Sequence, residues 1–153
     1  MNAPKYFEEI NPGDVFKTFG RTITEADIVL HAGQSGDFYP HHLNAEFAKT
    51  TPFGQRIAHG TLTFTVVIGL KACRFNPVAF TYGFDRIRFP KPVYIGDTIS
   101  VLATIVTKQE DPKRPRFGRY IERVEATNQR GEVVLVCDHI ALVERAAPIS
   151  QPD

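Results

Sequence analysis

The stretch "IAHGTLTFTVVIGLKAC", residues 57–73, decides how the chain folds, because it is compatible with a strand and with a helix. From Thr61 to Val66 polar and apolar residues alternate and most of them are β-branched, which favours a strand. The uninterrupted segment is about 17 residues long, however, which is long for a strand and suits a helix. Burial can override propensity, so the residues of this segment alone leave both structures open.

The residues that precede this segment predict helices joined by a loop. A helix is expected over residues 24–35, with Thr24 as its cap and apolar residues at helical spacing. A loop follows from Asp37 to His42, in which Pro40 disfavours helical geometry at Tyr39. Another short helix is expected over residues 44–49.

The residues that follow the segment predict strands. They are rich in Ile, Val and Thr, and prolines or glycine-containing turns separate them. Helices therefore gather in the first half of the chain and strands in the second, which predicts an α+β class with an antiparallel sheet. Strands are expected over residues 15–19, 80–84, 85–89, 98–108, 118–127 and 133–143.

Length and composition restrict the class of protein. The 153 residues suit one domain, residues 1–153, with a frayed tail from about Ala146. A formal net charge of +1 gives no indication of nucleic-acid or membrane binding. The two cysteines, Cys73 and Cys137, are expected to be a reduced, buried pair. We find no signal peptide or membrane span, and we therefore expect a cytoplasmic location.

The histidines do not indicate a metal site. They show no HxxxH or HxH spacing that carboxylates could complete, and we expect neither a metal nor a cofactor. The five histidines are His31, His41, His42, His59 and His139.

Two quoted segments resemble a known family. "GDFYPHHLNAEFAKTTPFGQRIAHGTL", residues 36–62, resembles the signature of MaoC-type (R)-specific enoyl-CoA hydratases, roughly G-D-x-N-P-x-H-x-D and then F-G-x-x-I-A-H-G. "FPKPVYIGDTI", residues 89–99, is similar to a later segment of that family. The resemblance implies the hotdog fold, a curved antiparallel sheet around one long central helix, here from about Ala58 to Cys73. Two residues depart from the family pattern. Tyr39 replaces the usual asparagine before the proline, and His41 stands before the histidine of the pattern. These differences make the resemblance less informative about the substrate than about the reaction.

The resemblance implies reversible hydration of an enoyl-thioester, 2-enoyl-CoA to 3-hydroxyacyl-CoA. Asp37 would be the principal base, and His42 would position the water and shuttle the proton. Taken without the resemblance, Asp37 can equally be a capping residue and His42 can simply begin the next helix. Neighbours in an extended segment point to opposite sides, so His41 is expected to face away from His42.

The thioester also requires a site for its oxygen and its acyl chain. Backbone N–H groups at Gly60, at the beginning of the expected helix, can stabilise the developing oxyanion, with His59 supporting the loop. Thr65 or Thr63 can take the place of a polar residue in the family's central helix. Candidates for the wall of an apolar slot are Phe38, Tyr39, Phe53, Phe64, Phe75 and Tyr82.

Two other functions remain open on this fold. The first is an acyl-CoA thioesterase, which usually carries a carboxylate on or near the central helix. Residues 58–73 contain no Asp or Glu, which argues against this function. The second is a catalytically silent subunit that binds acyl thioesters. The partner is expected to be an acyl-CoA or acyl carrier protein thioester. We also expect at least a homodimer, because an open antiparallel sheet needs a partner at its edge.

Overall fold

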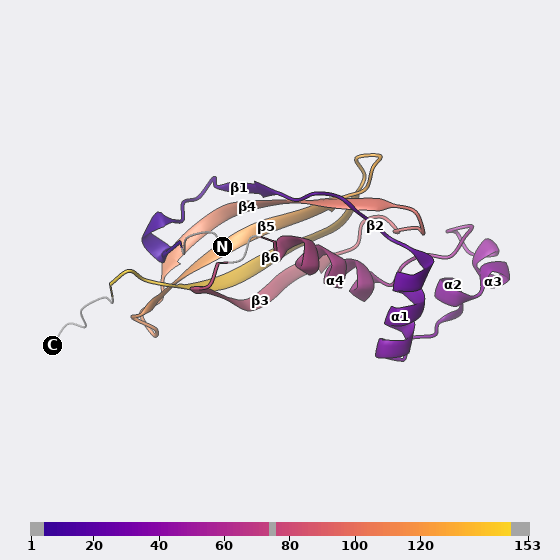
Figure 1. The fold of residues 1–153 in the computed structure, drawn as a ribbon, viewed down its shortest axis with the longest axis horizontal. Helices are drawn as coiled ribbons and strands as arrows, with labels where there is room; N and C mark the ends of the chain where they lie inside the picture. The colour runs from indigo at the N-terminus through magenta and orange to yellow at the C-terminus, as the bar shows by residue number, and fades with distance from the viewer. Residues whose placement is uncertain (1–4, 74–75, 148–153) are drawn as a thin grey trace.

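The computed structural model describes residues 5–73 and 76–147 and shows a curved antiparallel sheet with helices on one side and at one end (Figure 1). The sheet order is β1-β4-β5-β6-β3, and β2 pairs with β4. The strands are β1 (Val15–Lys17), β2 (Arg21–Thr22), β3 (Ala79–Arg88), β4 (Thr98–Glu110), β5 (Phe117–Thr127) and β6 (Val133–Glu144). The helices are η1 (Phe7–Glu9), α1 (Glu25–Ser35), α2 (Pro40–Leu43), α3 (Ala45–Lys49) and α4 (Gly60–Lys71). Residues 148–153 of the expected tail lie outside the described residues.

The long strands follow the alternation that the sequence predicts. In β4 the side chains of Ile99, Val101, Ala103 and Ile105 are buried, whereas the residues between them are more exposed. The stretches 80–84 and 85–89 form one strand, β3, whose register against β6 shifts twice. The expected antiparallel α+β sheet is therefore confirmed, and β3 is one of its edges.

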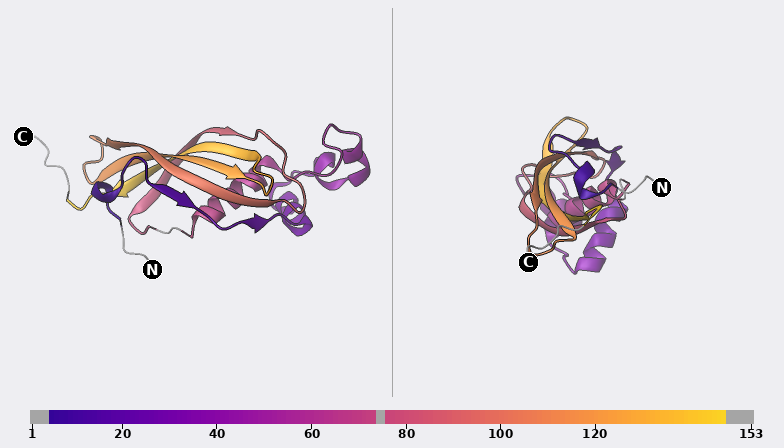
Figure 2. Two further views of the ribbon diagram at one scale, coloured as in Figure 1. Left: turned by 90° about the horizontal axis from the view of Figure 1, so that it is seen from above. Right: turned by 90° about the vertical axis from the view of Figure 1, so that its left-hand side faces the viewer.

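The ambiguous segment is a helix, α4, which lies along the inner face of the sheet. Its buried residues Leu62, Val66 and Val67 belong to one core cluster with Val101 of β4 and Leu135 of β6. The sheet curves around this helix in the end-on view of Figure 2. Packing against the sheet offsets the weak helix propensity of the β-branched residues. The helix begins at Gly60 and ends at Lys71, slightly inside the expected bounds of 58 and 73.

The first helix ends where the candidate site begins. Thr24 and Asp27 form a reciprocal capping box at the N-terminus of α1, since each side chain accepts from the other's backbone N–H. At the other end Gly36 adopts a left-handed conformation with φ of 75°, which favours glycine. This turn directs the chain out of α1 and into Asp37.

The expectation of an extended loop up to His42 is wrong. Pro40 is the first residue of a one-turn helix, α2, which includes both His41 and His42. Proline restrains the residue before it, and Tyr39 indeed has a non-helical backbone with ψ of 135°. At the first position of a helix, however, proline is favoured, because the missing N–H needs no partner there.

The cysteines do not form a buried pair. Cys137 is buried in β6, and burial raises the pKa of its thiol to about 11. Cys73 is exposed just after α4, with its thiol donating to the carbonyl of Leu70 at 2.9 Å. The expectation that both are buried is therefore wrong for Cys73, because α4 ends two residues before it.

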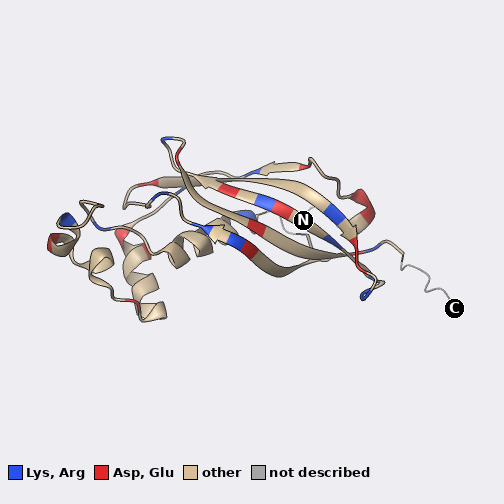
Figure 3. Cartoon of the chain, turned by 180° about the vertical axis from the view of Figure 1, so that it is seen from behind, with Lys and Arg blue, Asp and Glu red and all other residues tan. Residues whose placement is uncertain are grey.

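Charged residues of both signs are interspersed on the outer face of the sheet (Figure 3). Asp138 of β6, for example, is paired with Arg86 of β3 and Arg123 of β5. This pattern agrees with a formal net charge of +1.

Among the described residues, none of the helices has both the length and the apolar character that a bilayer-crossing helix requires.

Candidate active site

Three side chains from different segments converge next to the N-terminus of α4. They are Asp37, which follows α1, His42 in α2, and His59, which directly precedes α4. Each has a nitrogen or carboxylate oxygen within 4.8 Å of those of the other two. Asp37 is exposed, whereas His42 and His59 are buried. A solvent-accessible carboxylate therefore lies at the edge of a group of buried imidazoles.

The backbone fixes which nitrogen of His42 is available. Nδ1 lies 2.8 Å from the carbonyl oxygen of Ile57, and a carbonyl only accepts hydrogen bonds. Nδ1 therefore carries the hydrogen, and in the neutral ring Nε2 presents a lone pair. Burial is the main cause that lowers the pKa of His42, and the neighbouring His59 and His41 lower it further. The structure thus favours a neutral His42 with a basic Nε2.

His41 does not face away from His42, contrary to the expectation from an extended loop. The two Nε2 atoms are 2.9 Å apart and the rings are nearly perpendicular. Since Nε2 of neutral His42 accepts, His41 must donate its Nε2–H to it. The helical turn α2, rather than a strand, brings these neighbours to the same side.

His59 ties the Asp37 turn to the beginning of α4. Its Nε2 lies 2.9 Å from the carbonyl oxygen of Asp37, to which it must donate, and its ring stacks on that of His42 at 3.7 Å. Nδ1 of His59 is buried and has no hydrogen-bond partner among the described residues. Asp37 is further held by its own Oδ1, which accepts from the backbone N–H of Tyr39 at 3.1 Å.

The same three side chains could also hold a metal ion, which the spacing of the histidines along the sequence does not reveal. Histidine and carboxylate ligands suit zinc. Because backbone carbonyls engage Nδ1 of His42 and Nε2 of His59, a metal would be bound by Nε2 of His42 and Nδ1 of His59. The expectation of a metal-free site stays a prediction.

The N-terminus of α4 faces this group. His59 is the N-cap of the helix and provides no side-chain hydrogen bond to it. The backbone N–H of Thr63 bonds to the carbonyl of His59, so the preceding N–H groups, beginning at Gly60, lie in the helix's unsatisfied first turn. A Cβ on Gly60 would lie only 3.1 Å from the ring of Phe89. The missing side chain therefore leaves room for the ring of Phe89. Gly60 itself is partly exposed, and the first N–H groups of the helix favour negative charge.

Aromatic residues surround the site on its α2 side. The ring of Tyr39 lies 4.6 Å from that of His41, and the ring of Phe53 lies 5.9 Å from it. Phe38 and Tyr39 are more than half exposed, at 61% and 56%. Exposed aromatic rings beside a polar group form a suitable rim for an apolar ligand.

The candidates for the polar position of the central helix, and the other candidates for the slot, lie outside the group of Asp37, His42 and His59. Thr65 is exposed on α4 and its hydroxyl donates back to the carbonyl of Thr61, while that of Thr63 donates to His59. Phe64 packs against the core and Tyr82 is on the edge strand β3. Phe75 lies outside the described residues.

His31 of α1 is a neighbour of the site that the sequence did not reveal. Its Nε2 lies 2.8 Å from the hydroxyl oxygen of Thr61, and its ring is 4.9 Å from that of His59. Burial, followed by the nearby His59, lowers the pKa of His31. No local pattern indicated this contact, because the fold brings together residues that are about 30 positions apart.

The comparisons with known proteins agree on one family. A family model described as the MaoC like domain matches residues 8–127. Protein MaoC of Klebsiella aerogenes is 44% identical over 105 residues, which cover 68% of this chain but only 31% of that protein. An (R)-specific enoyl-CoA hydratase of Rhodospirillum rubrum is 38% identical over 100 residues, covering 65% of this chain and 69% of that one.

Solved structures extend the likeness to nearly the whole chain. A MaoC-like dehydratase from Rhodospirillum rubrum superposes with a TM-score of 0.84 at 27% identity, covering 95% of this chain and 99% of that one. The expected hotdog fold, a curved antiparallel sheet around α4, is confirmed. The match of the family model over most of the chain, together with this fold, shows that the protein is a member of the MaoC-like dehydratase family.

Proposed function

We propose that the protein catalyses the reversible addition of water to an enoyl-thioester, a 2-enoyl-CoA giving a 3-hydroxyacyl-CoA. Asp37 and His42 would activate one water, and the first N–H groups of α4, at Gly60, would stabilise the oxyanion. Relatives named as an (R)-specific enoyl-CoA hydratase and a 3-hydroxybutyryl-CoA dehydratase support this reaction class.

The observation that carries the proposal is the spacing of Asp37 and His42. Their polar atoms lie within 4.8 Å of each other. A water that forms two hydrogen bonds of ordinary length and angle joins atoms about 4.5 Å apart. The helix N-terminus at Gly60 lies directly after His59, so a thioester carbonyl can meet its N–H groups beside the same water.

The roles follow from the hydrogen bonds. Nε2 of His42 would exchange its bond to His41 for a hydrogen bond from the water, because Nδ1 remains bound to Ile57. Asp37 would accept a proton as the water oxygen bonds to the β-carbon and the carbon–carbon double bond becomes an enolate. The proton then passes through His42 to the α-carbon, and the pair ends the turnover in its starting state.

Mass spectrometry of crotonyl-CoA incubated with the protein tests the reaction. We expect a gain of one water with the thioester intact, and the same rate after dialysis against EDTA. Release of free CoA thiol would instead indicate a thioesterase, although α4 contains no Asp or Glu. Calorimetric binding of a panel of enoyl-CoA thioesters without any turnover would indicate a silent binding subunit.

The pH dependence should show an acid limb below the ordinary pKa of histidine. Protonation of Nε2 of His42 removes the lone pair that holds the water, and the pKa of His42 is lowered from 6.5, chiefly by burial. We therefore expect kcat/KM to be constant above pH 6.5 and to fall only at lower pH. A limb with its midpoint above pH 6.5 would contradict the neutral role of His42.

Unfolding in urea provides the control for this profile. The pKa of His42 is lower in the folded protein than its ordinary value of 6.5. Between pH 6.5 and that lowered pKa, the unfolded chain therefore binds more protons at this residue than the folded protein does. Its contribution to the free energy of unfolding is complete above pH 6.5 and is lost as pH falls through this window. The assay is interpreted only at pH values where the protein remains folded.

A homodimer is part of the proposal. Strand β3 is ten residues long and forms an edge of the sheet, with Phe80 and Tyr82 exposed at 51% and 53%. A long edge strand with exposed aromatic residues favours pairing with another strand. Light scattering should give about twice the chain mass of 17.2 kDa.

A further inference from the structure

The threonines of α4 occupy alternate positions in its first half, and their hydroxyls do not have the same kind of partner. Thr63 donates to the carbonyl of His59 at 3.2 Å, and Thr65 donates to that of Thr61 at 2.9 Å. The backbone of their own helix therefore engages both of these hydroxyls. The hydroxyl of Thr61 instead contacts another element, since its oxygen lies 2.8 Å from Nε2 of His31 in α1.

The contact between His31 and Thr61 leaves polar atoms of both side chains available. Within residues 5–73 and 76–147, the hydroxyl of Thr61 has no partner besides His31, and Nδ1 of His31 has none. A hydroxyl can accept one hydrogen bond and donate another at the same time. Thr61 is exposed and His31 is half-buried, so a ligand can reach this hydroxyl.

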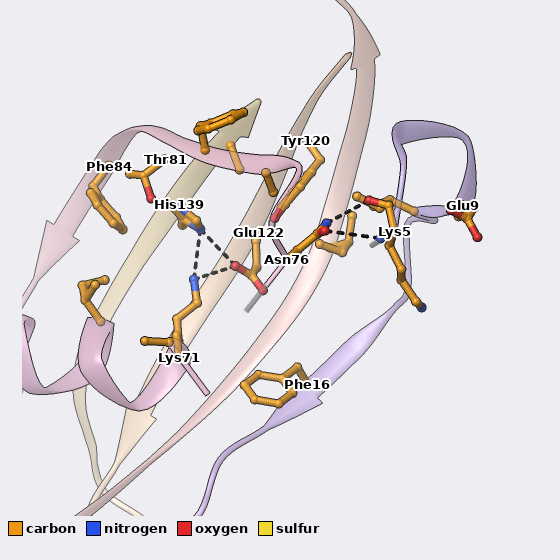
Figure 4. A pocket seen from close by; sticks show the side chains of 17 residues that line it. Lys5, Glu9, Phe16, Lys71, Asn76, Thr81, Phe84, Tyr120, Glu122 and His139 are labelled. Carbon is orange, nitrogen blue, oxygen red and sulfur yellow. Dashed lines mark hydrogen bonds and ion pairs between the residues drawn. The ribbon is translucent and has the colours of Figure 1, made fainter. Parts of the chain in front are cut away.

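A second contact between a threonine and a histidine, beside the last residue of α4, serves as a comparison (Figure 4). There the hydroxyl of Thr81 lies 3.1 Å from Nε2 of His139. Nδ1 of the same ring lies 3.1 Å from Glu122 and 3.0 Å from Lys71. Protein groups therefore occupy both nitrogens of that ring. The ring of His31 lacks such a second anchor in the described part of the chain.

Thr61 lies at the end of α4 where we propose that the thioester oxygen binds. It directly follows Gly60, so its backbone N–H is one of the unsatisfied groups of the first turn. Side chains on a helix lean toward its N-terminus, which brings a hydroxyl of this turn toward an oxygen held by these N–H groups. The ring of His31 is also on this side, 4.9 Å from the ring of His59.

We infer that Thr61 is a further catalytic residue, whose hydroxyl donates to the thioester oxyanion, and that His31 is a positioning residue that holds this hydroxyl. Nε2–H of His31 donates to the oxygen of Thr61, and the O–H of Thr61 donates to the charge that develops beside Gly60. A hydroxyl that accepts a hydrogen bond becomes a better donor itself. The inference rests on the proposed hydration reaction, because that reaction creates the oxyanion.

The tautomer of His31 decides the direction of these hydrogen bonds. Burial is the main cause that lowers the pKa of His31 from 6.5, so at neutral pH the ring carries a single N–H. With the hydrogen on Nε2, the ring donates to Thr61 and leaves the hydroxyl hydrogen free for the ligand. With the hydrogen on Nδ1, the ring accepts that hydrogen instead. Negative charge on the thioester oxygen favours the first arrangement, because it attracts the hydroxyl hydrogen.

The Thr61→Val variant removes the hydroxyl and keeps the branched shape of the side chain. We expect kcat for crotonyl-CoA hydration to fall at least about tenfold, with KM within about threefold of the parent, because the hydroxyl acts on charge that develops in the transition state. Thr61→Ser should keep most of kcat. Thr22→Val is the matched control, because it removes a contact of the same 2.8 Å length, between Thr22 and Thr98 of β2 and β4. An unchanged kcat in Thr61→Val protein contradicts the inference.

The His31→Phe variant tests whether His31 acts through Thr61. It keeps a planar ring without any donor, and kcat should fall about as far as in Thr61→Val. His31→Gln retains an N–H donor and should restore most of kcat. The double variant should lose no more than Thr61→Val alone, because a positioning residue has no effect once the group it positions is absent. Additive losses in folded protein would show that His31 does not act through this hydroxyl.

Acetoacetyl-CoA separates the inference from the proposed reaction, because ultraviolet absorbance reports its enolate without any addition of water. We expect the parent to stabilise the bound enolate. Thr61→Val should raise the pH at which half of the bound ligand is enolate by about one unit, which corresponds to a tenfold change. If crotonyl-CoA is not hydrated but this shift is found, the proposed reaction is wrong and the oxyanion donor remains.

Nitrogen-15 NMR of the parent protein with acetoacetyl-CoA decides the question even if a variant does not fold. We expect the signals of His31 in this complex to show the hydrogen on Nε2 and a lone pair on Nδ1. A parent protein that does not stabilise the enolate, or a His31 ring with its hydrogen on Nδ1 in the complex, overturns the inference.

Discussion

Replacement of Asp37 by asparagine is expected to lower kcat for crotonyl-CoA hydration by at least about 100-fold, the usual contribution of a positioned general base. The amide keeps the shape of the side chain and can still accept from the N–H of Tyr39 through its oxygen. It cannot accept a proton from the water. Stopped assays of hydrated product, at substrate concentrations above KM, measure the effect.

Asp14→Asn is the matched control for this variant. Asp14 also accepts a local backbone N–H, that of Asn11, but it lies in the turn before β1 and away from the site. Its replacement should leave kcat unchanged. The assignment of Asp37 as the base is wrong if the Asp37→Asn variant unfolds at the same urea concentration as the parent and keeps its turnover within about threefold.

The strands of the sheet could be predicted because each carries its own signal. One face of β4 is buried and the other is not, so alternation along the sequence directly reports the pleat. The central helix could not be derived in this way. Burial against the sheet, which involves residues distant in sequence, decides the structure of α4, and only the family resemblance indicated it.

In the candidate site, too, some features can be predicted from local sequence and others depend on the fold. The segment that contains Asp37 and His42 could be found from its residues and its resemblance to a family. The predicted orientation of His41 is wrong, because the restraint of Pro40 on Tyr39 indicates an extended loop, whereas Pro40 is also a favoured first residue of a helix. Contacts such as Lys71 with Glu122 and His139 join residues 51 and 68 positions apart, and no local pattern reveals them.

The second large effect is expected from His42→Asn. The asparagine side-chain amide can still donate to the carbonyl of Ile57, so the main buried hydrogen bond of His42 is kept. No basic nitrogen remains to receive the proton, and kcat should again fall by at least about 100-fold. The free energy of unfolding should change far less than in His42→Ala, which leaves the Ile57 carbonyl without a donor and creates a void.

Comparison with His41→Ala separates the two neighbouring imidazoles. Removing His41 frees Nε2 of His42 from its present hydrogen bond, so the water can bind there without competition. We therefore expect His41→Ala to change chiefly KM, through the lost contacts with Tyr39 and Phe53, and to keep kcat near that of the parent. If His41→Ala loses more kcat than His42→Asn while both remain folded, the basic nitrogen belongs to His41, and the assignment of the water to Nε2 of His42 is wrong.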